Sequence, residues 1–250
     1  MSSAPVTAHV WLDRPLEGDA WFADLSDAER QRAAGLRFAR DRNSYVAAHG
    51  LLRRALSERV PEVAPSQWQF VSDAVGRPEL AAPFRDTGLR FSLSHAPGAV
   101  ACVVTQEAAC GIDVESLTRE INVFALAKRT ASATEREALQ ALPVADRGAL
   151  FLRLWTLKEA YAKAIGSGLS TPFDVLSFDL ADGIALRSTS DAHALDEFGF
   201  AQWTTGDGHV VAVAAAADGD RPLRVVLHGQ DERPAVARDG EPVTRASRPA

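Results

Sequence analysis

Hydrophobic and polar residues alternate in several short segments of the chain, and a two-residue period predicts β-strands. The first such segment is Val6 to Leu12. The later ones are bounded by turn-forming residues; they are WQFVS (68–72), RFSLS (90–94), AVACVVT (99–105), GIDVE (111–115), LSFDL (176–180), FAQWT (200–204) and HVVAVAAA (209–216). Strands are therefore expected in both halves of the chain.

A helical period is present between these segments. Tyr45, Ala48, Leu52 and Leu56 recur at three- and four-residue spacing, which predicts a helix over about 41–56.

Two further helices begin at capping boxes, SDAE at Ser26 to Glu29 and SATE at Ser132 to Glu135. The second capping box leads into a long helix that carries WTLKEAYAKAIGSGL (155–169), where Gly166 is suited to end the helix in a left-handed conformation.

The two halves of the chain follow a similar order of elements. FSLSHAPGAVACVV, from Phe91, and FAQWTTGDGHVVAVA, from Phe200, each run strand, polar turn, strand, and each lies roughly 65–70 residues after a capping box. The pattern predicts an α+β protein with two related subdomains, 1–107 and 108–228, and a groove between them as the ligand site. The polar remainder, 229–250, predicts a disordered tail.

Composition narrows the class of protein. The chain has 250 residues, is 46% hydrophobic and carries a net charge of −6, which argues against a general nucleic-acid binder. Cys102 and Cys110 lack a CxxC spacing, and a reduced thiol in an apolar strand favours the cytoplasm. No export signal and no run of about 18 apolar residues is found, so no membrane association is expected.

Two acidic residues in GIDVE are candidates for chemistry. In a strand, Asp113 and Glu115 point to the same face about 6.5–7 Å apart, with Ile112 and Val114 facing the core. Taken alone, the pair is more simply a polar strand face exposed to water. A hard cation such as Mg²⁺ would relieve the repulsion between the two carboxylates.

Polar residues at two turns are weaker candidates. Ser94 and His95 stand at the end of a predicted strand, and Arg77 in the sequence Gly-Arg-Pro is held extended by the proline that follows it. Between Arg30 and Arg59 the chain has eight arginines against two acids, which is either a solvated helix face or a docking site for anions.

Glu159 and Lys163 lie four residues apart on the long helix. This spacing by itself is typical of a surface ion pair worth about 0.3–0.5 kcal/mol.

In their order along the chain, GRP, FSLSH, GIDVE and WTLKEAYAKAIGSGL resemble the successive motifs of the Sfp-type 4′-phosphopantetheinyl transferases, over about residues 10–215. The resemblance implies a pseudo-twofold dimer of two α+β subdomains. It also implies a reaction, in which the 4′-phosphopantetheine arm of coenzyme A is moved to a serine of a carrier protein and adenosine 3′,5′-bisphosphate is released.

The resemblance also assigns roles to the candidate residues. Asp113, Glu115 and Glu159 are the implied Mg²⁺ ligands, Glu159 is also the implied general base, and Lys163 faces the phosphates. The implied coenzyme A contacts are Arg37, Arg42, Arg77, Ser94 and His95, with Lys158, which points about 100° away from Glu159 on the helix, as a secondary candidate.

The chain departs from the family pattern in three motifs or segments. Arg77 replaces a frequent lysine and keeps the positive charge, whereas Ser92 and Ala96 stand where Asn and Ser are common, and the Arg-rich tail has no counterpart.

Two alternatives use the same residues: a non-catalytic module that binds coenzyme A and a carrier protein, and a metal-dependent hydrolase of coenzyme A. The expected partners are coenzyme A and acyl, peptidyl or aryl carrier domains of polyketide, nonribosomal peptide or fatty acid synthesis, and the protein is expected to act as a monomer. The basic stretch from Arg30 to Arg59, with Arg53 and Arg54, is the expected docking surface for such acidic domains.

Overall fold

The computed structural model of the chain describes residues 4–15, 21–73, 76–170, 172–181, 183–188, 197–217, 221–229 and 244–245. Its helices are α1 (Asp27–Ala34), α2 (Ala39–Arg59), α3 (Val123–Thr130), α4 (Ala133–Ala141) and α5 (Val144–Ile165). Its strands are β1 (Val6–Asp13), β2 (Phe70–Ser72), β3 (Pro78–Leu80), β4 (Leu89–Ala96), β5 (Ala99–Gln106), β6 (Cys110–Ser116), β7 (Leu176–Asp179), β8 (Ala185–Ser188), β9 (Phe198–Thr204), β10 (His209–Ala216), β11 (Leu223–His228) and β12 (Thr244–Arg245).

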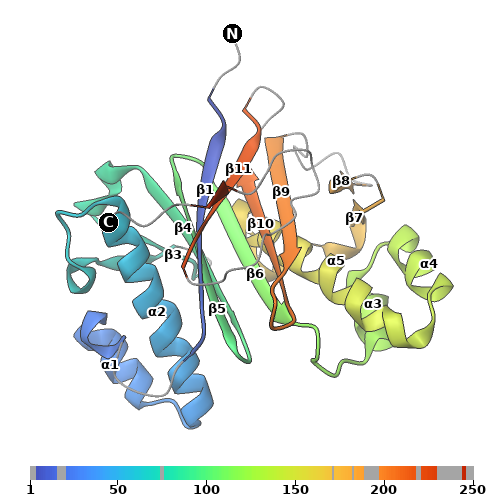
Figure 1. Cartoon of the computed structure of the whole chain (residues 1–250), viewed down its shortest axis with the longest axis horizontal. Helices are drawn as coiled ribbons and strands as arrows, with labels where there is room; N and C mark the ends of the chain where they lie inside the picture. Colours follow the sequence, from blue (N-terminus) through green and yellow to red (C-terminus); the bar gives the residue numbers. More distant parts are fainter. Residues whose placement is uncertain are drawn as a thin grey trace.

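Two antiparallel hairpins form the centre of the fold. In the first half β4 pairs with β5, and β5 pairs with β1; in the second half β9 pairs with β10, and β10 pairs with β6. A long helix covers the outer face of each sheet, α2 in the first half and α5 in the second (Figure 1). The two halves thus repeat one topology, which confirms the expected α+β fold with two related subdomains.

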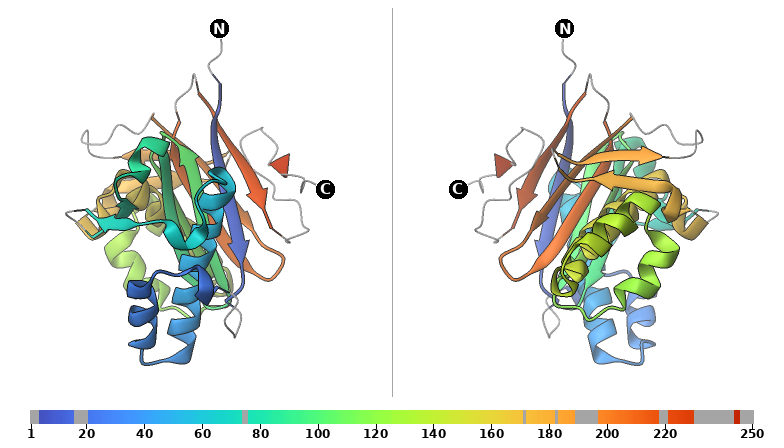
Figure 2. Two further views of the ribbon diagram at one scale, coloured as in Figure 1. Left: turned by 90° about the vertical axis from the view of Figure 1, so that its left-hand side faces the viewer. Right: turned by 90° about the vertical axis from the view of Figure 1, so that its right-hand side faces the viewer.

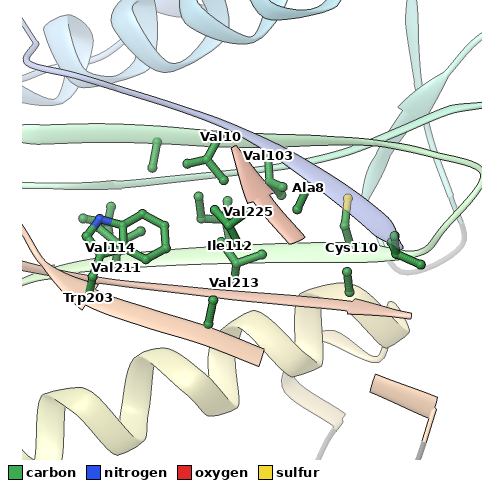
Figure 3. Close-up of a cluster of buried hydrophobic side chains, with 14 of the residues drawn as sticks. Ala8, Val10, Val103, Cys110, Ile112, Val114, Trp203, Val211, Val213 and Val225 are labelled. Atoms are coloured by element: carbon green, nitrogen blue, oxygen red, sulfur yellow. The ribbon is translucent and has the colours of Figure 1, made fainter. Parts of the chain in front are cut away.

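The layers follow the order α2, first sheet, second sheet, α5 (Figure 2). The inner faces of the two sheets are almost entirely Val, Ala and Ile, and these side chains interlock between the sheets as drawn in Figure 3. Ile112 and Val114 belong to this core. Consequently Asp113 and Glu115 must point to the opposite face of β6, toward α5.

The chain crosses between the halves at its end. β11, which follows the second hairpin, pairs in parallel with β1 of the first half, with Val6 opposite Leu223 and Trp11 opposite His228. The predicted second subdomain, 108–228, therefore ends with a strand, β11, that belongs to the sheet of the first half. Most of the predicted tail, 229–250, lies outside the described residues; within it, Thr244–Arg245 pairs with β11.

Both capping boxes are present. Ser26 and Ser132 each accept a hydrogen bond from the backbone N–H of the glutamate three residues on, and each glutamate bonds back to the serine N–H. The helix after Ser132 ends at Ala141, and α5 begins separately after Pro143. In the described part of the chain, no helix has the length and apolar character needed to cross a membrane.

Candidate functional site

The site is built where β6 and α5 approach closely. Gly111 faces α5 on the same side of β6 as Asp113, and a Cβ atom at Gly111 would lie 1.9 Å from the carbonyl oxygen of Ala160. A residue without a side chain is required at this point. The close contact places Glu159 and Lys163 of α5 over the acidic face of β6.

Asp113 is the centre of the hydrogen-bond network. Its Oδ1 accepts a hydrogen bond from Ser94 Oγ at 2.7 Å and an ion pair from Lys163 Nζ at 2.7 Å, and the same ammonium donates to the carbonyl of Ile112 at 3.0 Å. Lys163 therefore pairs with Asp113 across the two elements, and the ordinary ion pair with Glu159 along the helix is not formed.

The second carboxylate oxygen of Asp113 has no partner. Asp113 is only 6% exposed, and its Oδ2 is buried without a hydrogen bond in the described structure. A buried carboxylate oxygen without a donor costs free energy, and a bound cation at Oδ2 would remove that cost.

The other two carboxylates of the predicted metal site are half-buried. Glu115 accepts an ion pair from Arg119 at 2.5 Å, whereas Glu159 has no hydrogen bond or ion pair to any described residue. Burial raises the pKa of both groups, and the negative charge of Asp113 raises them further. The three carboxylates therefore interact electrostatically, and their role as metal ligands, which the family resemblance implies, stays a prediction.

The carboxylates of β6 and α5 offer oxygen ligands for a metal ion. Among the described residues, no three His, Cys, Asp or Glu side chains form a ready-made metal site. Asp113 and Glu115 are each neutralised by a protein cation, Lys163 and Arg119. The donor set still suits a hard cation, because Asp113 Oδ2 and the Glu159 carboxylate are oxygens that receive no hydrogen bond and no ion pair from the described residues.

Ser94 and His95 lie at the end of β4, beside this network. Ser94 is buried and links the halves, because its Oγ also accepts from the backbone N–H of Val114 at 3.4 Å. Ser92 bonds in the same way to the N–H of Ile112. His95 is exposed; desolvation by neighbouring atoms and the charge of Lys163 lower its pKa.

Arg77 reaches across from the first half to the end of α5. Its guanidinium lies 3.3 Å from the carbonyl of Ala164 and 3.4 Å from that of Cys110. Together with Lys163 and Gly166 it lines a cavity of about 260 Å³ between the halves. A cavity thus lies between the halves, and Arg77 contributes positive charge to its lining; that this cavity is the ligand site stays a prediction.

The two early arginines lie on the other side of the site. Arg42 is half-buried on α2 and approaches the carbonyl of Leu36 at 3.5 Å. Arg37 precedes the helix, is exposed, and its guanidinium stacks over Phe38 at 5.3 Å. In the described structure neither contacts the carboxylates of β6 and α5.

Lys158 is not part of the site. Its Nζ donates to Thr130 O at 2.8 Å, to Glu135 Oε2 at 2.5 Å and to Phe173 O at 2.7 Å, and only 2% of the residue is exposed. Three acceptors use all three of its N–H protons. The expectation that Lys158 contacts coenzyme A is therefore wrong, because the one-residue step around α5 turns this side chain into the core.

The basic stretch on α2 is also less available than expected. Arg53 is 1% exposed and bound to Glu29, while Arg54 pairs with Asp24 and stacks over Trp21 at 4.1 Å. These two arginines hold α2 to its neighbours. A carrier-docking role for Arg53 is excluded by its burial.

Sequence reasoning missed one residue that builds the site, Gly111. Gly111 precedes the acidic residues of GIDVE and was not considered, although a glycine inside a strand often marks a close approach of another backbone. A second contact was not predicted either: the capping-box residue Glu29 also meets His49 of α2, whose Nδ1 lies 2.9 Å from Glu29 Oε1. Their meeting across α1 and α2 has no signal in local spacing.

Comparison with known proteins relates the chain to the 4′-phosphopantetheinyl transferases. A sequence model of the 4′-phosphopantetheinyl transferase superfamily matches residues 109–216. Over 222 residues the chain is 34% identical to the 4′-phosphopantetheinyl transferase HetI of Nostoc sp., covering 86% of this chain and 90% of that protein. It is 28% identical over 189 residues to the 4′-phosphopantetheinyl transferase Sfp of Bacillus subtilis, covering 74% of this chain and 81% of that protein.

Among solved structures, the chain is similar to the holo-[acyl-carrier-protein] synthase of Thermotoga maritima. The two are 22% identical with a TM-score of 0.38, covering 44% of this chain and 63% of that chain.

Proposed function

Because the chain belongs to the 4′-phosphopantetheinyl transferase superfamily, we propose that the carboxylates of β6 and α5 carry out its transfer reaction. The protein transfers 4′-phosphopantetheine from coenzyme A to a serine hydroxyl of an apo carrier protein and releases adenosine 3′,5′-bisphosphate. The observation that carries the assignment of residues is the buried Asp113, bound by Lys163 on one oxygen and without a partner on the other.

Asp113, Glu115 and Glu159 are the residues that would hold Mg²⁺. When bound, the ion supplies positive charge to the pyrophosphate of coenzyme A. Asp113 Oδ2 offers a buried oxygen without a hydrogen bond, and Glu159 offers a carboxylate whose pKa burial and the charge of Asp113 raise.

Glu159 is placed to accept the proton of the acceptor serine. Its pKa is raised by burial and by Asp113, so the carboxylate is a stronger base than an exposed glutamate. As the serine Oγ forms its bond to the phosphorus of the pantetheine arm, the bond from that phosphorus to the bridging oxygen breaks. The electron pair leaves on adenosine 3′,5′-bisphosphate, and the serine proton passes to Glu159.

Lys163 and Arg77 provide the fixed positive charge around the phosphates. Both line the cavity between the halves, and Lys163 can donate from the ammonium that already bonds to Asp113. Ser94 keeps the Asp113 carboxylate oriented, and His95 with Arg42 and Arg37 extends the basic wall toward α2.

The buried cysteines and the net charge bear on the compartment and the partners of the protein. We place it in the cytoplasm as a monomer that binds neither nucleic acid nor membranes. Cys102 and Cys110 are buried free thiols whose pKa burial raises, which suits a reducing compartment. The net charge of −6 does not favour a polyanionic partner.

The experiment that tests the function supplies an apo acyl carrier protein, coenzyme A and Mg²⁺, and follows the intact mass of the carrier. We expect a gain of one phosphopantetheine on the acceptor serine, abolished when that serine is replaced by alanine. Binding of coenzyme A without any gain in carrier mass would favour the non-catalytic alternative. Loss of coenzyme A without carrier modification would favour the hydrolase.

A further inference from the structure

Two hairpin turns, one from each half of the fold, meet at a buried histidine that the transfer reaction does not use. β4 and β5 are joined by the turn Pro97–Gly98, and the turn between β9 and β10 contains Asp207. His209 is the first residue of β10, and its Nε2 lies 2.9 Å from the carbonyl oxygen of Pro97. Only 6% of His209 is exposed. The ring therefore joins the second half to the first.

Both nitrogens of the His209 ring face an acceptor. Nδ1 lies 3.1 Å from Asp207 Oδ1, and Nε2 faces the carbonyl of Pro97. Partial burial raises the pKa of Asp207, but hydrogen bonds from Thr205 and His209 outweigh burial and lower that pKa to about 2, so the carboxylate is ionised near neutral pH. A ring that bonds to both acceptors donates from each nitrogen and carries a positive charge, which strengthens both hydrogen bonds.

The turn behind the ring is itself held in place. Asp207 Oδ2 pairs with Arg14, the residue after β1, at 3.1 Å, and Thr205 donates a hydrogen bond to Asp207 Oδ1. The backbone N–H of His209 donates to Thr205 Oγ1 at 3.0 Å. The direction of the ring toward Pro97 is therefore fixed from the side of the second half.

β4 needs an anchor of this kind, because it is not paired with β6. In the described strands, β4 is at the edge of the first sheet and β6 is at the edge of the second. Ser92 and Ser94 connect these edges by long bonds of 3.3 and 3.4 Å to the N–H groups of Ile112 and Val114, and Ser94 also donates to Asp113 at 2.7 Å. Long hydrogen bonds are weak, so these contacts alone hold the end of β4 loosely.

The His209 contact lies close to the site on both strands. Pro97 is only two residues after His95, the last polar side chain of β4. His209 pairs with Ser116 of β6, directly after Glu115. A hydrogen bond from His209 to Pro97 therefore fixes the end of β4 relative to the end of β6.

Resting on the proposed function, we propose that His209 is a positioning residue for the transfer reaction, which holds the end of β4 against β6 through the carbonyl of Pro97. Without this bond, Ser94 shifts relative to Asp113, and His95 shifts relative to the phosphates of coenzyme A. His209 acts through the turn and not by contact with either substrate.

Two amide substitutions separate the two hydrogen bonds of the ring. His209→Gln places its amide nitrogen near the position of Nε2 and keeps a donor for Pro97, whereas His209→Asn places it near Nδ1 and keeps a donor for Asp207 alone. Neither side chain is charged, so a difference between the two variants isolates the bond between the halves.

The test measures coenzyme A affinity by calorimetry and the kinetics of carrier modification, at a temperature where circular dichroism shows each variant folded. We expect His209→Asn to lose about 10-fold in affinity for coenzyme A and in kcat/KM, with the KM for apo carrier protein little changed, because the first half is misplaced. His209→Gln should stay within about 2-fold of the wild type, since it keeps the bond to Pro97.

Gly98→Ala disturbs the same turn if His209→Asn does not fold. Gly98 has φ +89°, and an added Cβ would lie 3.4 Å from the His209 ring, so the turn must shift while the exposed position tolerates the change. It should weaken coenzyme A binding in the same direction.

The positioning role is overturned if the folded His209→Asn, or Gly98→Ala in its place, binds coenzyme A as the wild type does, or if His209→Gln is as impaired as His209→Asn. Lower stability with unchanged kinetics would make the histidine a structural residue only. A wild type that binds coenzyme A but modifies no carrier would refute the transfer function, and the coenzyme A affinities of the variants would still decide whether His209 positions β4.

Discussion

At the scale of single residues, the site depends on how each oxygen of Asp113 is satisfied. One oxygen has two donors, Ser94 and Lys163, and the other is buried with none. A fully paired carboxylate would be a structural feature of the core, whereas a half-paired one beside Glu159 is suited to bind a cation. The four-residue spacing of Glu159 and Lys163 therefore does not form a surface ion pair, because Lys163 bonds to Asp113 and leaves Glu159 without an ion pair.

Glu159→Gln keeps the size of the side chain and removes its charge and basicity. We expect phosphopantetheine transfer to fall by about 10²-fold or more, because a proton acceptor and a carboxylate ligand are lost together. Coenzyme A binding should persist through Arg77 and Lys163, as measured by calorimetry. Near-normal turnover of the variant would mean that Glu159 is only a polar surface residue.

His9 makes the stability of the first sheet depend on pH. Burial lowers its pKa to about 4 from 6.5, assisted by Arg59, and its Nδ1 lies 2.8 Å from His228 Nε2. The unfolded chain binds the proton more readily, so stability is complete above pH 6.5 and is lost as pH falls toward 4. Because His9 is only partly buried, solvent screens its neighbours, and the loss is on the order of 1–2 kcal/mol.

Urea unfolding of the wild type and of His9→Asn at pH 7 and pH 5 measures this effect. The wild type should lose more stability than the variant between the two values, since the variant has no ring to protonate. An equal loss in both proteins would assign the acid sensitivity to other groups.

At the scale of elements, the packing of α5 on β6 sets the geometry of the site. Gly111→Ala would place a methyl group 1.9 Å from the backbone oxygen of Ala160 and 2.6 Å from the nitrogen of Ala164. Because backbone atoms cannot rotate away, the helix must shift. We expect a loss of about 1–3 kcal/mol or more in unfolding free energy, together with reduced transfer.

Gly148→Ala is the control on α5, the helix against which Gly111 packs, with no atom within 4 Å of the added Cβ. It should raise stability by up to about 1 kcal/mol through helix propensity and leave transfer unchanged. If both glycine variants behaved alike in thermal unfolding, the close approach at Gly111 would not control the site.

Replacement of Lys158 distinguishes a structural role from the predicted contact with coenzyme A. Its ammonium and Glu135 form a buried ion pair, with both side chains 2% exposed. Lys158→Ala should cost about 3–5 kcal/mol of stability, because a buried carboxylate loses its partner. If the variant instead kept its stability and lost affinity for coenzyme A, Lys158 would belong to the nucleotide site.

The sequence predicted the local elements well and their long-range pairing poorly. Alternation placed β4, β5, β6, β9 and β10, and the capping boxes placed α1 and α4, because these signals are local. The sequence prediction of one long helix after Ser132 was wrong, because Pro143 has no backbone N–H and separates α4 from α5. The pairing of β11 with β1, and of His49 with Glu29, joins residues far apart in sequence, and no local pattern encodes such contacts.

At the scale of the whole molecule, two halves of like topology have different tasks. The second half supplies the carboxylates through β6 and α5, and the first half supplies Arg77, Ser94 and His95. Ser92 and Ser94 join the halves by accepting hydrogen bonds from backbone N–H groups of β6. A nucleotide bound between the halves would therefore contact both of them, and its affinity depends on their mutual position.

The most direct measurement of the account is the release of adenosine 3′,5′-bisphosphate, followed together with the formation of holo carrier protein. With coenzyme A and Mg²⁺, the account predicts that the nucleotide appears only when apo carrier protein is present, in equal amount to the modified carrier. Release of nucleotide without carrier, or in large excess over modified carrier, would show that water is the acceptor and would contradict the transfer reaction proposed for this site.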